Sequence, residues 1–333
     1  MAVDGDTLVV GAQLNGADYG AVYVYEWVMG AWQEQDKLYP SDRGAGGQGF
    51  GFSVDLEGDW LIVGAPDDQG NGAYAGAAYL FERTSGSWRQ VKKLTADDAA
   101  AGDAFGRSVG FSSGTAIVGA PGVFVDLING AVLNADPDAV EEDDELDNSE
   151  NDSVYVFSQE GTSWLQRANW SWAGSDAGRS VGIDGDLLAI GRAAQDGAGD
   201  VLVYEQTSAN TWTFNNDLTP SDPDSGEEFG YALAVEDQRV VVGAPYWDGI
   251  TGGNPNQGRA FVFDQSGDQW TRVARLTGGG GLPAADASGQ DQAGGLFGLT
   301  VATNNGTVVV GAPGFQPCPY PHLTVGPVPA EGM

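Results

Sequence analysis

Short runs of apolar residues, separated by turns that contain glycine, recur along the chain. A typical run is Leu61-Ile62-Val63, which follows the turn pair Glu57-Gly58 and ends before Pro66. Such short runs between turn residues predict β-strands, and the glycine supplies the positive φ that a tight hairpin needs. Apolar periodicity of helix length is almost absent, so the pattern predicts an all-β chain.

The apolar runs belong to a repeat with a fixed internal spacing. A Phe-Gly pair stands before each run, a Val-Gly-Ala-Pro motif ends it, and the glycines of the two motifs are thirteen residues apart. These glycine pairs are Gly51 and Gly64, Gly106 and Gly119, Gly178 and Gly191, Gly230 and Gly243, and Gly298 and Gly311. The copy with Gly178 and Gly191, the fourth when the copy at the start of the chain is counted, departs from this pattern. It has Ala177 in place of Phe and Gly191-Arg192-Ala193 in place of Gly-Ala-Pro. Repetition at a period of roughly 50 residues indicates an array whose copies bury their apolar faces against one another.

Each copy reads as four strands that meander, which favours a β-propeller over a linear solenoid. We predict about six four-stranded antiparallel blades over residues 1–315, followed by a proline-rich irregular tail over 316–333. The expected units are 1–42, 43–98, 99–173, 174–222, 223–280 and 281–315. The first unit lacks most of its first strand and the last breaks off after Pro313. We therefore expect either a ring closed by 281–315 with 1–42 or an incomplete seven-bladed ring, in part of a larger polypeptide.

The fourth strand of a unit runs from a tryptophan to a large apolar residue six positions later, as from Trp88 to Leu94. Side chains alternate along a strand, so an even spacing places both residues on one face. We expect that single face to pack on the next blade.

These motifs resemble the FG-GAP repeats of the integrin α-chain propeller and its bacterial and archaeal relatives. The closest copy is Phe105-Gly106-Arg107-Ser108-Val109 with Val118-Gly119-Ala120-Pro121, and the resemblance covers most of residues 1–315. It implies a ring of up to seven blades, usually extracellular, that serves adhesion or ligand recognition. In many members a loop of the pattern Asp-x-Asp-x-Asp-Gly between the first two strands holds calcium. Here that loop is shortened to turns such as Asp55-Leu56-Glu57-Gly58-Asp59, which are too short to surround Ca²⁺ with six or more oxygens, so we do not expect the family's calcium sites.

The chain is strongly acidic, with 47 acidic and 14 basic residues and a net charge of −33. This charge argues against a nucleic-acid partner, because the phosphate backbone would be repelled. It suits a solvated surface in a salty or extracellular setting. No apolar stretch is long enough to cross a membrane, so we expect no membrane insertion, and an export signal would lie outside this sequence.

The connection between the second and third strands varies in length from unit to unit, whereas the first hairpin does not. Variable loops on a rigid scaffold are where binding residues concentrate. We predict that Tyr246, Trp247, Asp248, Asn254 and Asn256 contact a protein or glycan ligand, although the two aromatic rings are equally suited to packing between blades.

Two acidic loops offer oxygen ligands for a cation. Asp67, Asp68 and Asn71 could hold Ca²⁺, but such clusters are also ordinary turn formers. The ten acidic residues between Asp136 and Asp152 would repel one another, so we expect a solvated insertion there, with divalent ions or a basic partner as the alternative.

We identify no catalytic residue. His322 is the only histidine and lies in the tail, so neither a Ser-His-Asp triad nor a histidine metal site can form within the repeats. The sequence favours a non-catalytic extracellular recognition or adhesion module that binds a protein or glycan through loops on one face. The alternatives are a structural spacer of a larger surface protein and a polysaccharide-cleaving propeller that uses acidic residues.

Overall fold

The computed structural model describes residues 1–13, 20–43, 49–122, 125–126, 131–132, 152–193, 197–248, 256–278 and 295–313. The chain divides into two compact units, Met1–Arg179 and Ser180–Met333. The described residues contain strands and no helix, so no helix among them could span a membrane.

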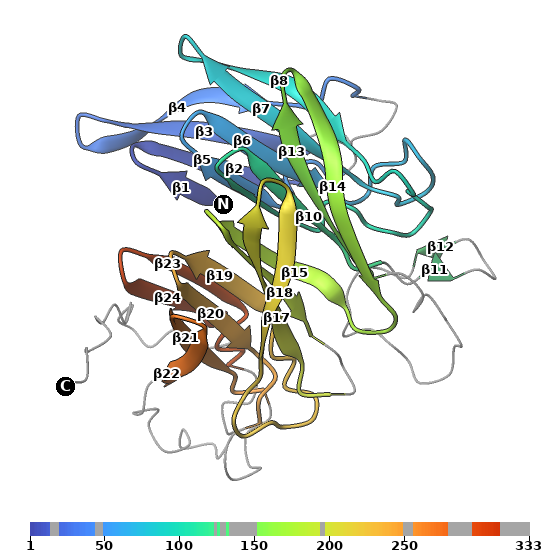
Figure 1. Cartoon of the computed structure of the whole chain (residues 1–333). Coiled ribbons are helices and arrows are strands. Elements are labelled where there is room, and N and C mark those ends of the chain that lie inside the picture. Colours follow the sequence, from blue (N-terminus) through green and yellow to red (C-terminus); the bar gives the residue numbers. More distant parts are fainter. Residues whose placement is uncertain are drawn as a thin grey trace, which may run out of the picture. The chain divides into compact units, whose positions relative to one another are not determined.

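Three four-stranded antiparallel sheets form within the first unit (Figure 1). Sheet one consists of β1 (Ala2–Asp4), β2 (Thr7–Ala12), β3 (Ala21–Val28) and β4 (Ala31–Leu38). Sheet two consists of β5 (Val54–Glu57), β6 (Trp60–Ala65), β7 (Ala77–Thr84) and β8 (Ser87–Leu94). Sheet three consists of β9 (Ser108–Ser112), β10 (Thr115–Ala120), β13 (Asp152–Glu160) and β14 (Ser163–Trp172), and a small ribbon pairs β11 (Val125–Asp126) with β12 (Ala131–Val132).

Later repeats form two more four-stranded sheets and one hairpin, drawn from yellow-green to red in Figure 1. Sheet four consists of β15 (Ala177–Asp184), β16 (Leu187–Arg192), β17 (Asp200–Ser208) and β18 (Thr211–Leu218). Sheet five consists of β19 (Ala232–Glu236), β20 (Arg239–Ala244), β21 (Arg259–Ser266) and β22 (Gln269–Thr277). Sheet six contains β23 (Thr300–Asn304) and β24 (Thr307–Gly311).

This arrangement confirms the predicted all-β fold, a β-propeller built from repeated antiparallel sheets. The fourth copy forms a complete four-stranded sheet despite Ala177. A short β1 completes sheet one, so the first copy keeps part of its first strand. The predicted tail and most of the acidic insertion lie outside the described residues, and the domain limits stay predictions.

The spacing of thirteen residues has a backbone cause. In sheet two the amide of Gly51 donates to the carbonyl of Gly64 at 3.0 Å, and this bond recurs in three later sheets. Gly51 has a φ of 90°, a left-handed conformation that glycine adopts at little cost. Strand one begins after the Phe-Gly pair in most copies, at Val54 in sheet two.

Neighbouring sheets join through the same glycines. A methyl group on Gly64 would overlap the carbonyl oxygen of Gly106, the Phe-Gly glycine of the next sheet. The serine two residues after each of three Phe-Gly positions also donates a hydrogen bond to the next sheet. These bonds join Ser53 to the Gly106 carbonyl (2.8 Å), Ser108 to Gly178 (2.6 Å) and Ser180 to Gly230 (2.7 Å). The Phe-Gly and Gly-Ala-Pro motifs are thus the two halves of one contact between sheets.

Hydrophobic clusters fill the spaces between adjacent sheets within each unit. The phenylalanine of the Phe-Gly pair lies in these clusters and meets two aromatic rings of its own third strand. Phe105, for example, is fully buried, with ring centroids 5.4 Å from Tyr155 and 6.0 Å from Phe157. Aromatic pairs of this kind add about 0.5–1.5 kcal/mol beyond the burial of their area.

The expectation of one packed face on strand four is wrong. Leu94 lies opposite Ala78 and Trp88 lies opposite Arg83, and these partners are five residues apart on β7. An odd separation puts them on opposite faces, so Leu94 joins the core shared with sheet three and Trp88 the core shared with sheet one. The cause is a β-bulge that adds Val91 to β8, and each four-stranded sheet has the same irregularity between its third and fourth strands.

Candidate functional site

Each sheet has two ends of different character. The tight turns between strands one and two and between strands three and four form what we call the hairpin end. The connections after strand two and after strand four form the loop end, where the sequence predicts binding. Both ends carry charged side chains that link neighbouring sheets.

At the loop end of sheet two, a lysine lies among two carboxylates and a tyrosine, the Lys93 cluster. The Lys93 ammonium is 2.6 Å from Asp42 Oδ2 and 2.9 Å from Asp68 Oδ2. The Tyr79 hydroxyl lies within hydrogen-bond distance of both carboxylates, 3.0 Å from Asp42 and 2.9 Å from Asp68, and shares its one hydrogen between them. Burial acts to lower the pKa of Lys93, but its hydrogen bonds to Asp42 and Asp68 outweigh burial and raise it. The ammonium therefore stays charged and balances the buried carboxylate of Asp68, which is 1% exposed.

The predicted metal ligands are placed around this cluster. Asp68 Oδ1 accepts from the Gly70 amide at 2.9 Å, so the carboxylate also closes its own loop. Asp67 is half-buried, and burial raises the pKa of its carboxyl, while Asn71 is exposed. Among the described residues, no group of three or more His, Cys, Asp or Glu side chains is arranged to hold a metal ion. The cationic partner of Asp68 is thus Lys93, and the calcium site at Asp67, Asp68 and Asn71 stays a prediction.

At the loop end of sheet five, a buried arginine at the start of β21 lies against Trp247, which has the position of Asp68, and we call these residues the Arg259 cluster. Arg259 is fully buried, with Nη2 2.5 Å from Glu227 Oε2 and Nη1 3.1 Å from Asp222 Oδ2. Its guanidinium carbon lies 4.8 Å from the centre of the Trp247 ring, within cation–π range. Burial raises the pKa of Glu227 even though Arg259 acts to lower it.

The predicted ligand-binding residues surround the Arg259 cluster. Trp247 is only 7% exposed, so its ring packs on Arg259 and offers little surface to a ligand. Tyr246 is half-buried and meets the ring of Tyr231 edge-on at 5.8 Å. Asp248 is exposed, and its Oδ1 accepts from the Asn256 amide at 2.9 Å. Asn254 lies outside the described residues, so the structure leaves Tyr246, Asp248 and Asn256 as the accessible part of this prediction.

The two clusters share one scaffold that sequence reasoning missed. An aspartate in a Pro-Ser-Asp segment pairs with a basic residue on strand four of the next sheet, Asp42 with Lys93 and Asp222 Oδ2 with Arg275 at 2.8 Å. The signal was the repeated Pro-Ser-Asp after strand four, together with a basic residue just before the strand-four leucine. On this shared frame, the loop after strand two contributes Asp68 in one sheet and Trp247 in the other.

At the hairpin end, carboxylates of one sheet accept hydrogen bonds from the turn of the next. Asp4 Oδ2 accepts from the Gly58 amide and Glu57 Oε2 from the Ser113 amide, both at 2.7 Å, and Asp184 Oδ2 accepts from the Asp237 amide at 2.6 Å. Each of these carboxylate oxygens therefore already accepts a hydrogen bond from a backbone amide. These bonds hold each hairpin against the next, and the absence of the family's calcium sites from the hairpins stays a prediction.

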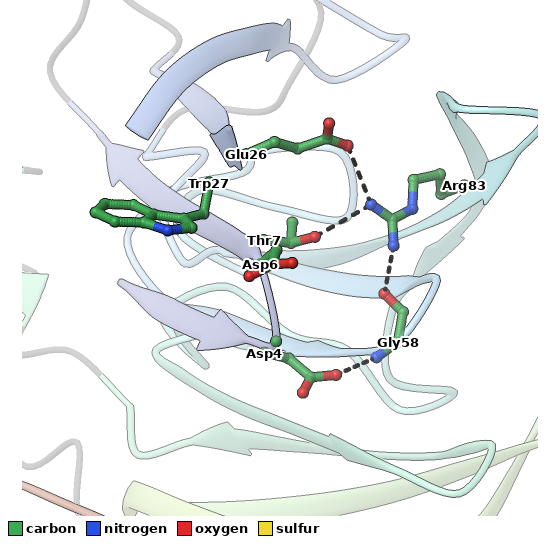
Figure 2. Close-up of a pocket in the computed structure, with 8 residues that line it drawn as sticks. Asp4, Asp6, Thr7, Glu26, Trp27, Gly58 and Arg83 are labelled. Carbon is green, nitrogen blue, oxygen red and sulfur yellow. Dashed lines mark hydrogen bonds and ion pairs between the residues drawn. The ribbon is translucent and has the colours of Figure 1, made fainter. Parts of the chain in front are cut away.

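Between the hairpin ends of sheets one and two lies a hollow of about 450 Å³. Its lining is formed by Asp4, Gly5, Asp6, Thr7, Glu26, Trp27, Gly58 and Arg83. Figure 2 shows Trp27 and Arg83 on opposite sides, with Asp6 and Thr7 between them. Sequence reasoning missed this hollow, because its two walls come from different repeats.

Arg83 is held in place by protein partners on every side. Its Nε donates to Asp59 Oδ1 at 2.7 Å, and its Nη1 donates to Thr7 Oγ1 at 3.1 Å and to Glu26 Oε1 at 3.4 Å (Figure 2 shows the last two). Its Nη2 also contacts the Gly58 carbonyl at 3.5 Å. The guanidinium thus ties sheet two to sheet one and neutralises part of the negative charge around the hollow.

The chain matches a protein-family model. The model of the FG-GAP repeat matches the chain three times, at residues 32–81, 88–136 and 212–263. Each match starts on strand four of one sheet, and the first and third end on strand three of the next. Each matched unit therefore contains one Phe-Gly and one Gly-Ala-Pro motif, which contact different neighbouring sheets: in the first match, Gly51 meets Gly11 and Gly64 meets Gly106. A search of curated proteins gives no match to this chain.

Proposed function

Because the chain is an FG-GAP repeat protein, we propose that it is a non-catalytic module that recognises a protein or a glycan outside the cell. FG-GAP repeats form propeller modules that are often extracellular and generally lack catalysis. The proposal gives the loop end the binding role and the hairpin end a structural one.

The observation that supports it is the contrast between the two ends. The hairpin ends repeat the same acid-to-amide bonds, whereas the loop ends place different chemistry on one shared frame, as Asp68 and Trp247 show. Rigid frames with variable loops are typical of recognition surfaces. In sheet five the frame presents Tyr246 and Asp248 next to a buried arginine.

The test measures ligand binding by the whole chain on arrays of purified glycans and extracellular matrix proteins. Tyr246→Ala and Asp248→Ala should weaken capture of a bound ligand at least about five-fold, the loss expected of the few contacts that dominate an interface. Asp268→Ala is the matched control, because Asp268 is exposed at the hairpin end of the same sheet. Thermal melting would verify that all three variants fold.

Two results would overturn the proposal. One is the absence of any bound glycan or matrix protein. The other is release of reducing sugar from polysaccharides by the intact chain, which would show catalysis.

A further inference from the structure

Trp27 departs from the residue types found at its position in the repeat. The equivalent strand-three position is Arg83 in sheet two and glutamine in the other sheets, at Gln159, Gln206 and Gln265. The backbone makes the same hydrogen bond in sheets one and four, because the amides of Trp27 and Gln206 donate to the backbone carbonyls of Asp6 and Asp186, both at 2.8 Å. The fold therefore accepts a polar side chain at this position. Sheet one instead has Trp27, whose side chain is 45% exposed.

The Trp27 ring lies at the rim of the hollow. It meets Trp32 edge-on, with ring centroids 5.3 Å apart, across the β3–β4 hairpin. Trp32 and Trp27 both keep about two fifths of their surface exposed. A rigid, partly exposed indole loses little conformational entropy on binding, which is why tryptophan is enriched at binding hot spots.

The charges around the hollow favour a cation. Asp4, Asp6 and Glu26 line it against the single guanidinium of Arg83, and Arg83 is also bound to Asp59 outside the lining. The net charge of the whole chain, −33, repels anions and attracts cations over a longer range. An indole face beside carboxylates is the arrangement that binds an ammonium or a guanidinium group.

We propose that the hollow formed by Trp27, Asp4, Asp6 and Glu26 binds the cationic side chain of an arginine or lysine from a partner protein. The volume of about 450 Å³ accommodates such a side chain and excludes a folded domain. This site lies at the hairpin end and does not depend on ligand binding at the loop end. It gives the chain a contact surface for basic segments.

The experiment uses the whole chain and the peptide acetyl-Gly-Arg-Gly-amide, followed by saturation-transfer NMR on the peptide signals. The same peptide with citrulline in place of arginine has nearly the same shape without the charge. The arginine peptide should bind with saturation and the citrulline peptide should not. A lysine peptide should also bind.

Three variants locate the site. Trp27→Gln, which installs the residue found in sister sheets, should weaken binding about two- to five-fold through loss of the cation–π contact. Asp6→Asn should weaken it by a similar factor, and more at low salt than at high salt. Asp186→Asn is the matched control, since Asp186 has the equivalent exposed position in sheet four, and binding should not change.

Other results would overturn the inference. Equal loss of peptide binding in Asp6→Asn and Asp186→Asn would mean that the peptide is attracted to the acidic surface in general and that the hollow is not a specific site. Equal binding of the citrulline peptide would exclude charge recognition. Displacement of the peptide by neutral methyl glycosides would assign the indole to a glycan. If Trp27→Gln failed to fold, the comparison of Asp6→Asn with Asp186→Asn would still decide.

Discussion

At the scale of single residues, the phenylalanine of the Phe-Gly pair carries more of the stability than its place before a strand suggests. Phe50, Phe105 and Phe229 are fully buried, and each meets two aromatic rings of its third strand. Its ring thus joins a turn to the middle of the sheet. In these three copies the ring packs in the core and the glycine allows the close contact between sheets.

Phe105→Ala should therefore lower the free energy of unfolding by about 3–5 kcal/mol, the usual cost of truncating a buried aromatic residue. Phe214→Ala is the control, because Phe214 is 53% exposed and its loss should change stability by about 0.5 kcal/mol or less. Urea unfolding followed by circular dichroism measures both. Similar losses in the two variants would contradict the central place of Phe105.

A second residue-scale prediction concerns Asp55. Its Oδ2 accepts from the Phe111 amide at 2.7 Å, but burial outweighs this bond and raises the pKa of Asp55 to about 6. The folded state then binds the proton more tightly than the unfolded state, whose carboxyl pKa is about 3.9. Asp55 thus opposes folding increasingly as the pH rises from about 4 to about 6.

Asp55→Asn removes this penalty and keeps an oxygen that can accept from Phe111. The melting temperature of the variant, relative to that of the original chain, should rise between about pH 4 and pH 6 and then level off. Carboxyl ¹³C NMR of the original chain should show Asp55 titrating near pH 6. A constant difference in melting temperature across this range would argue against the raised pKa.

At the scale of elements, the glycine spacing makes a sharp prediction. Gly64→Ala places a methyl group against the backbone oxygen of Gly106 and should cost several kcal/mol, because backbone on both sides must move. Gly86→Ala is the control, because a Cβ at Gly86 would meet open space. Gly86 has a φ of 77°, so the only expected cost is about 1–2 kcal/mol for placing an alanine in the left-handed conformation. The two variants are compared by thermal melting, and a larger loss in Gly86→Ala would refute the close approach of the sheets.

The strands show what the sequence could and could not predict. Hairpins and strand two were predictable, because Glu57-Gly58 and the apolar run after it are local signals. The faces of Trp88 and Leu94 were not, because a bulge of one residue reverses every side chain beyond it and leaves no mark in the apolar spacing.

The candidate sites were predictable only in part for a related reason. The loop of Asp68 was identified, but its partner Lys93 lies twenty-five residues later, and the Asp42 that shares Lys93 belongs to the previous sheet. The burial of Trp247 also depends on Arg259, a residue of another strand. Pairings across sheets follow from the fold of the array, and a single copy of the repeat does not contain them.

At the scale of the whole molecule, charge dominates. With 47 acidic and 14 basic residues, the net charge is −33, and this excess of negative charge repels itself more in the compact state than in the extended chain. The ion pairs at Lys93 and Arg259 relieve this only locally. Added salt should therefore stabilise the chain, by roughly 2–4 °C in melting temperature for each 1 kcal/mol of repulsion that is screened.

The same measurement separates screening from specific calcium binding. The described carboxylates at the hairpin ends accept from amides and Asp68 pairs with Lys93, so we expect calcium and magnesium to raise the melting temperature alike at equal ionic strength. The scan compares NaCl, MgCl₂ and CaCl₂ from 0.05 to 0.5 M ionic strength, about the range over which the screening length falls below 10 Å. A saturable rise with calcium alone, well below these concentrations, would instead show a specific site. Loss of that rise in Asp67→Asn would then place the site at the loop of sheet two, and its persistence would point to carboxylates elsewhere in the chain.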